Sequence, residues 1–127
     1  MRLAGAILIC LLAVGCAKPL FPDKELQGTW DDILAAMRGG RVDEVRRLST
    51  GAGFAALTNP VFTGGEDLTR VFRRWGAEWP NERWRLMAIS VDYALTARGE
   101  NGPHGPVGGN FEFIRTNGVW RLSNWLH

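Results

Sequence analysis

The chain has 127 residues, of which 46% are hydrophobic and 22% are charged, and its formal net charge at neutral pH is +2. This length holds one domain, and this composition is that of a globular protein, which excludes a disordered chain. Aspartates and glutamates are interleaved with the arginines, so we expect no basic face of the kind that binds nucleic acid.

The first residues form a targeting segment. Met1 and Arg2 give a short positive region, and an apolar run follows at residues 3–14, broken only by Gly5. A membrane-spanning helix needs roughly 20 apolar residues, so this run is too short to span a bilayer and has the length of a signal-peptide core. We therefore predict a signal peptide over residues 1–15.

The apolar run ends at Leu12-Ala13-Val14-Gly15-Cys16. This motif resembles the lipobox of bacterial lipoproteins, in which a small residue precedes a cysteine that is acylated and becomes the mature N-terminus. The family prefers leucine three positions before the cysteine, where this chain has Ala13. The resemblance implies acyl chains such as palmitate on Cys16, which would hold the protein on a membrane. Two alternatives stay open: ordinary signal-peptidase cleavage, which leaves Cys16 as a free thiol, and an uncleaved membrane anchor.

The residue after this cysteine indicates to which of the two bacterial membranes the protein is attached. Ala17 stands where a signal for retention in the inner membrane, often aspartate, would lie. We therefore expect a protein of the bacterial cell envelope that is lipid-anchored to the outer membrane and faces the periplasm. Cys10 lies inside the signal peptide, so the mature chain keeps Cys16 alone and forms no internal disulfide.

Residues 16–28 read as the lipidated cysteine and a tether, and residues 29–127 as the folded domain. Thr29 is the predicted N-cap of a first helix, which Gly39-Gly40 ends. The apolar residues of this helix recur at helical spacing: Trp30, Ile33, Leu34 and Met37.

Two more helices are expected before residue 81. A short one carries Val42, Val45 and Leu48, whereas residues 51–63 stay ambiguous because Asn59-Pro60 breaks any single element. A longer one follows Gly64-Gly65 and ends at Trp79-Pro80. Its predicted core face consists of Leu68, Val71, Phe72, Trp75 and Trp79.

The apolar period changes to two between residues 84 and 98, which predicts one long strand. The strand is followed by a loop at residues 100–108. The predicted core face of the strand carries Met87, Ile89, Val91, Tyr93 and Leu95, and Asp92 shares the opposite face.

A β-hairpin closes the sequence. Asn117-Gly118 stands between two alternating runs, and both residues tolerate the positive φ of a type I′ turn. The expected register pairs Thr116 with Val119, Arg115 with Trp120, Phe113 with Leu122, and Phe111 with Asn124. It places Phe111, Phe113, Trp120 and Leu122 on the apolar face, and Glu112, Arg121, Ser123 and Trp125 on the other.

The order of the predicted elements over residues 29–127 resembles the nuclear transport factor 2-like superfamily: helices come first, then a long strand, then this hairpin. The resemblance rests chiefly on Phe-Glu-Phe-Ile-Arg-Thr-Asn-Gly-Val-Trp-Arg-Leu, which is similar to the last two strands of many members. It implies an α+β fold in which N-terminal helices pack on a curved antiparallel sheet to form a cone. The family includes ketosteroid isomerases, polyketide cyclases and immunity-like inhibitors, and sheet-to-sheet dimers are common in it. Another small α+β sandwich is the alternative fold.

The sequence offers little catalytic chemistry. His104 and His127 are the only histidines, and neither has a second ligand at metal-binding spacing, so no metal is expected. The glycine pairs lack a phosphate-loop signature and the serines lack a nucleophile elbow, so we predict no cofactor and no catalytic residue.

A binding function is therefore preferred. The candidate ligand-binding residues line the apolar side of the predicted cone: Tyr93, Asn124, Trp75, Phe111 and Phe113. The Tyr93 hydroxyl and the Asn124 amide could orient a small apolar ligand, or they could satisfy each other across the core. The expected partners are the membrane, through lipid on Cys16, and either a small apolar ligand or another envelope protein. A homodimer through the sheet and an isomerase, dehydratase or cyclase that uses Tyr93, with Asp92 if a bulge turns it inward, are the alternatives.

Overall fold

The computed structural model describes residues 23–81, 84–98, 101–102, 105–106 and 109–126. The predicted signal peptide, Cys16, the first part of the predicted tether, His104 and His127 lie outside these residues. Within the described part of the chain, no helix has the length and apolar character needed to cross a membrane.

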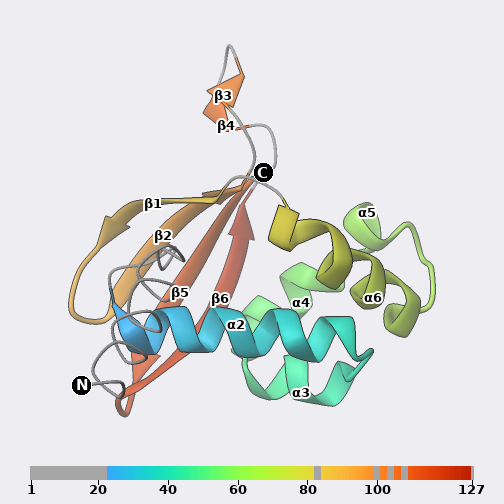
Figure 1. Cartoon of the computed structure of the whole chain (residues 1–127), viewed down its shortest axis with the longest axis horizontal. Coiled ribbons are helices and arrows are strands. Elements are labelled where there is room, and N and C mark those ends of the chain that lie inside the picture. Colours follow the sequence, from blue (N-terminus) through green and yellow to red (C-terminus); the bar gives the residue numbers. More distant parts are fainter. Residues whose placement is uncertain (1–22, 82–83, 99–100, 103–104, 107–108, 127) are drawn as a thin grey trace, which may run out of the picture.

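Helices come first in the chain and strands follow, so the α+β class is confirmed (Figure 1). The helices are α2 (Lys24–Arg38), α3 (Val42–Arg47), α4 (Gly51–Leu57), α5 (Pro60–Thr63), α6 (Leu68–Glu78) and the 3₁₀ turn η1 (Trp79–Asn81). The strands are β1 (Trp84–Ile89), β2 (Tyr93–Arg98), β3 (Asn101–Gly102), β4 (Gly105–Pro106), β5 (Asn110–Thr116) and β6 (Val119–Leu126).

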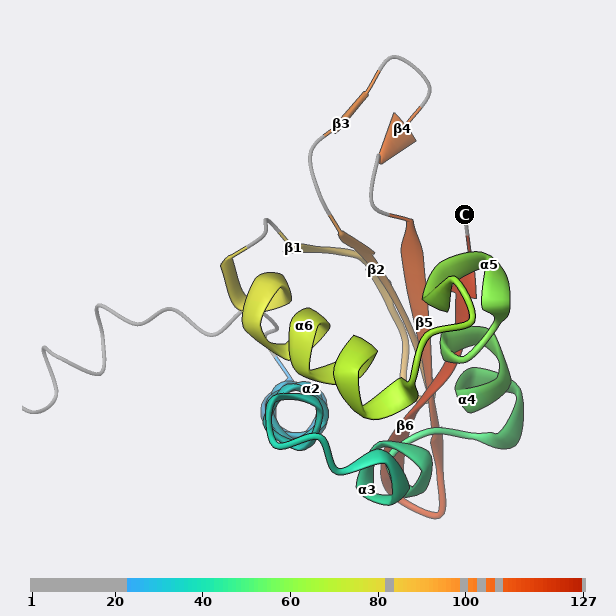
Figure 2. The ribbon, with the colours of Figure 1, turned by 90° about the vertical axis from the view of Figure 1, so that its right-hand side faces the viewer.

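One antiparallel sheet has the strand order β1-β2-β5-β6, and β3 pairs with β4 in a separate ribbon. The sheet is open and does not close into a barrel. Figures 1 and 2 show α2 and α6 together on one side of it, and α4 lies beside the edge strand β6. We call that side the inner face and the opposite side the outer face.

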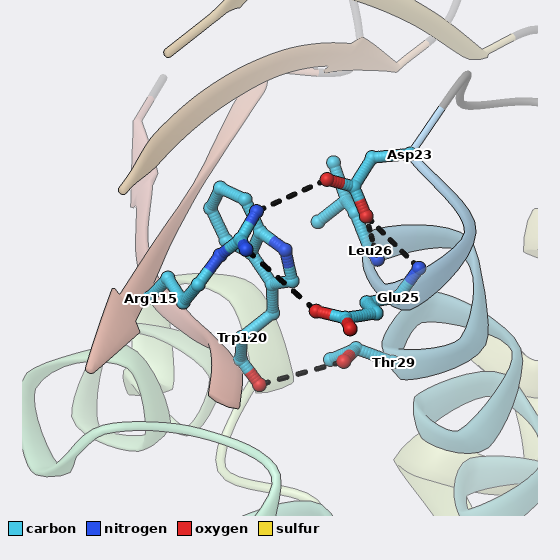
Figure 3. Close-up of polar contacts among 6 residues, drawn as sticks. All are labelled: Asp23, Glu25, Leu26, Thr29, Arg115 and Trp120. Atoms are coloured by element: carbon cyan, nitrogen blue, oxygen red, sulfur yellow. Dashed lines mark hydrogen bonds and ion pairs between the residues drawn. The ribbon is translucent and has the colours of Figure 1, made fainter. Parts of the chain in front are cut away.

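The first helix starts earlier than predicted. Helix α2 begins at Lys24, because Asp23 is the N-cap and its Oδ1 accepts the backbone N–H groups of Glu25 and Leu26. The second carboxylate oxygen of Asp23 lies 3.0 Å from Nη2 of Arg115 on β5 (Figure 3). Residues 24–28, assigned above to the tether, are therefore helical, and Thr29 is not the N-cap.

The remaining helix predictions agree with the structure. Gly39 is the C-cap of α2, the short helix α3 spans residues 42–47, and α6 ends before Trp79. The ambiguous segment forms the two short helices α4 and α5. Asn59 separates them: its side chain accepts the N–H of Val61, and Pro60 occupies the first turn of α5.

The prediction of one long strand over residues 84–98 is wrong, and so is its predicted core face. The segment is a hairpin, β1 and β2, closed by residues 90–92, with the Ser90 N–H donating to the Tyr93 carbonyl at 2.8 Å. On β2 the fully buried residues are Ala94, Thr96 and Ala97, and the first two lie opposite Phe113 and Phe111 of β5. Small side chains at these two positions leave room for the aromatic rings of the core. Met87, Ile89 and Val91 are exposed, and Tyr93 and Leu95 lie on the outer face.

The terminal hairpin follows the predicted register only as far as Phe113 and Leu122. Asn117 and Gly118 have φ values of 53° and 75°, as a type I′ turn requires. A β-bulge at Ser123 then shifts the register, so Phe111 pairs with Trp125, and Glu112 pairs with Asn124. Trp125 therefore enters the core, while Asn124 lies on the outer face; both were predicted the other way round.

The core lies between the helices and the inner face and is rich in aromatic rings. Trp79 packs against Trp75 with ring centroids 5.0 Å apart, and Phe111 stacks on Trp125 at 4.9 Å. Trp30 contacts Phe113 edge-on at 6.0 Å. Rings from α2, α6, η1, β5 and β6 thus meet one another directly.

Candidate functional site

Three polar side chains form a connected cluster on the outer face of the sheet: Tyr93 of β2, Glu112 of β5 and Asn124 of β6. The Tyr93 hydroxyl donates to Glu112 Oε2 at 2.6 Å. The Asn124 amide donates to the other carboxylate oxygen, Oε1, at 3.3 Å. We call Tyr93, Glu112 and Asn124 the outer-face cluster. All three side chains are half-buried, so the cluster is accessible from solvent.

The strand register brings these residues together. Glu112 lies on the central strand β5, opposite Leu95 of β2 and opposite Asn124 of β6. The bulge at Ser123 is essential to this arrangement, because without it Asn124 would lie on the inner face beside Phe111. The Ser123 hydroxyl donates to the Glu112 carbonyl at 3.0 Å and so fixes the bulge to β5.

The Asn124 side chain is held at both ends. Its Oδ1 accepts the backbone N–H of Trp125 at 2.9 Å, and this contact leaves the amide nitrogen directed at Glu112. The Glu112 carboxylate therefore accepts one hydrogen bond from each neighbouring strand, a charge-assisted pair that orders three strands of the outer face.

The hydrogen bond to Glu112 raises the pKa of the Tyr93 hydroxyl above its ordinary value of 10.0, and desolvation and the negative charge of Glu112 act in the same direction. Like an ordinary tyrosine, Tyr93 is protonated at neutral pH, and here its hydroxyl donates a hydrogen bond to Glu112. A tyrosine held in this form is suited to recognition rather than to removing a proton from a substrate.

The predicted ligand-binding residues divide between the two faces of the sheet. Trp75, Phe111 and Phe113 belong to the buried core, whereas Tyr93 and Asn124 lie on the outer face. The structure does bring Tyr93 and Asn124 together, through Glu112. The expectation that all five residues line one cone pocket is therefore wrong, because the predicted faces of β2 and of the end of β6 were reversed.

Glu112 is the member of the cluster that sequence reasoning missed as a candidate. Its position between Phe111 and Phe113 placed it correctly on the outer face. Its partners were hidden, since one depends on the face of β2 and the other on the bulge at Ser123.

The described residues do not support the catalytic role considered for Asp92 or a metal site. Asp92 is exposed in the β1–β2 turn, where its carbonyl accepts the N–H of Arg115 at 2.9 Å, so no bulge turns it inward. Among the described residues, no group of three or more histidine, cysteine, aspartate or glutamate side chains is arranged to hold a metal ion.

Comparison with known proteins adds no relative: no protein-family model, no curated protein and no solved structure matches this chain.

Proposed function

We propose that this protein is a bacterial envelope lipoprotein, anchored by acyl chains on Cys16, whose domain binds another envelope protein without catalysing a reaction. The binding surface in this proposal is the outer face of the sheet. The domain would be a variant of the nuclear transport factor 2-like cone. Helices followed by a four-stranded antiparallel sheet and an Asn-Gly hairpin support that fold assignment.

The outer-face cluster is the observation that carries the proposal. An ordered tyrosine, glutamate and asparagine lie on a sheet face that the helices leave open, beside the half-buried side chains of Leu95 and Ile114. Tyrosine is enriched in protein interfaces, because its ring buries apolar area and its hydroxyl supplies a directed hydrogen bond. A flat surface of apolar side chains around an ordered polar centre suits a protein partner.

The packing of aromatic rings on the inner face favours a protein partner over a small apolar ligand. The candidate residues Trp75, Phe111 and Phe113 are in ring contact with Trp79, Trp125 and Trp30. Rings packed at these separations form a filled core. The enzyme alternative would need Tyr93 and an acid in one pocket, whereas Tyr93 and the acid it bonds, Glu112, lie on the outer face of the sheet.

The anchor is tested by fractionation and mass spectrometry of the full chain and of Cys16→Ser. We expect the wild-type protein to carry a diacylglyceryl mass on residue 16 and to sediment with membranes, and the variant to be released. Membrane retention of Cys16→Ser, or an unmodified Cys16, would overturn the anchor.

The binding surface is tested by photo-crosslinking in the cells that produce the protein, with a photoreactive amino acid at Leu95 or Ile114. The matched control position is Val61 on α5, whose side chain is 82% exposed. We expect one discrete product of higher mass from the outer-face positions, and less of it in Glu112→Ala. Equal labelling at all three positions would contradict the proposal, and a product with the mass of two copies would identify a homodimer instead.

A further inference from the structure

The end of β1 and the β1–β2 turn carry three exposed apolar side chains, those of Met87, Ile89 and Val91. Their exposed fractions are 52%, 42% and 76%. Six large hydrophobic residues are exposed in the described part of the chain, and three of them fall within the short segment 87–91; we call these three the hairpin-tip patch. Scattered exposed apolar residues are ordinary, whereas a cluster on a protruding turn marks a contact surface.

The patch lies at the end of the domain from which the predicted tether leaves. Arg115 of β5 contacts both the β1–β2 turn and the start of α2. Its backbone N–H donates to the Asp92 carbonyl at 2.9 Å, and its Nη2 lies 3.0 Å from Asp23 Oδ2. Val91 precedes Asp92, and Asp23 is the first residue that the structure describes. Figure 1 shows the start of α2, the β1–β2 turn and the β5–β6 turn at the same end of the molecule.

The short tether keeps this end close to the lipid. Seven peptide steps separate Cys16 from Asp23, and a fully extended chain of that length spans at most about 25 Å. Val119, a fourth exposed apolar residue, follows the β5–β6 turn at the same end.

We propose that the hairpin-tip patch inserts into the interface of the bilayer that holds the acyl anchor, so that the domain sits on the membrane in one orientation. This inference rests on the proposed anchor at Cys16. We expect the attraction to be mainly apolar, since Arg115 is paired with Asp23 and Glu25, and the negative charge of Asp92 offsets the positive charge of the exposed Lys24. Zwitterionic phospholipid is therefore the expected surface.

The test places a fluorescent label of environment-sensitive emission on Val91→Cys in the lipidated full chain. The mature chain has no free cysteine of its own once Cys16 is acylated, so the label goes to one position. The matched control is Val61→Cys on α5, at the opposite end of the molecule in Figure 1. Both proteins are reconstituted in phosphatidylcholine–phosphatidylethanolamine vesicles, with and without bromine on the acyl chains.

We expect emission from position 91 to shift to the blue and to be quenched several-fold by the brominated lipids, and emission from position 61 to do neither. Equal, water-like emission at both positions would overturn the inference. Wild-type-like tryptophan fluorescence of the two labelled proteins shows that they are folded.

A second experiment tests the hairpin-tip patch independently of the acyl anchor. In Cys16→Ser, an N-terminal polyhistidine tag ahead of residue 17 attaches the chain to nickel-chelating lipid in the same vesicles. Quenching at position 91 there supports the patch even if mass spectrometry finds no lipid on Cys16. Water-like emission at position 91 there, with native lipid present on the wild type, overturns the patch and leaves the anchor standing.

Discussion

The carboxylate of Asp23 and the guanidinium of Arg115 are 92 residues apart in the sequence and meet at 3.0 Å. One oxygen of Asp23 caps helix α2 while the other pairs with Arg115, which also lies over the ring of Trp120 at 4.6 Å (Figure 3). This carboxylate therefore joins the start of the helical layer to the centre of the sheet.

Asp23→Ala should lower the free energy of unfolding, because it removes both the cap and the ion pair. The cap alone is worth about 0.5–2 kcal/mol. Asp23→Ser is the matched control, since serine can cap the helix without pairing with Arg115, and it should lose less. Denaturant unfolding followed by tryptophan fluorescence measures both; equal losses would show that the cap contributes nothing.

Gly53→Ala should destabilise the domain because α4 packs backbone to backbone against β6. A Cβ on Gly53 would lie 2.0 Å from the Leu122 carbonyl oxygen, so one element must move. Overpacking of this kind costs about 1–3 kcal/mol. Gly51→Ala in the same helix meets no atom within 4 Å and should change stability by less than about 0.5 kcal/mol. Thermal or denaturant unfolding measures the stability of both variants. Similar losses in Gly53→Ala and Gly51→Ala would contradict the close contact.

Phe111→Ala should cost about 3–5 kcal/mol, as expected for deleting a ring from a filled core. Phe111 is fully buried and contacts Trp30, Trp79 and Trp125. The exposed Val61→Ala should stay within about 0.5 kcal/mol of the wild type. Calorimetry or denaturant unfolding measures both values. A loss below about 1 kcal/mol for Phe111→Ala would point to an open cavity at this position.

Tyr93 should titrate above the ordinary tyrosine pKa, and it is the only tyrosine, so tyrosinate absorbance reports it alone. Because the pKa is higher in the folded state, the folded protein binds the proton more tightly. The stabilisation from the Tyr93–Glu112 hydrogen bond is thus present below about pH 10 and is lost as the pH rises through the folded-state pKa. Glu112→Ala should move the midpoint down towards 10.0. Circular dichroism at each pH confirms that the chain is folded during the titration; an unchanged midpoint in the variant would remove Glu112 as the cause.

Local signals predicted several elements correctly. Asn117-Gly118 specified the turn and the first half of the β5–β6 register, since both residues accept positive φ. Gly39-Gly40 marked the end of α2, and the helical spacing of Val71, Phe72 and Trp75 identified the buried side of α6. The α+β class followed from the change of period.

The sequence by itself therefore determined where most helices and turns lie, because caps, breakers and periodicity act within a few residues. Tertiary structure decided which face of β2 is buried. Alternation defines two faces, and Ala94 and Thr96 face the helices because their small side chains fit opposite Phe113 and Phe111. It also decided the bulge at Ser123, which exchanges Asn124 with Trp125 and assembles the outer-face cluster. Asp23, which caps the start of α2, pairs with Arg115, far along the chain. A contact between such distant residues forms only once helix and sheet have packed together.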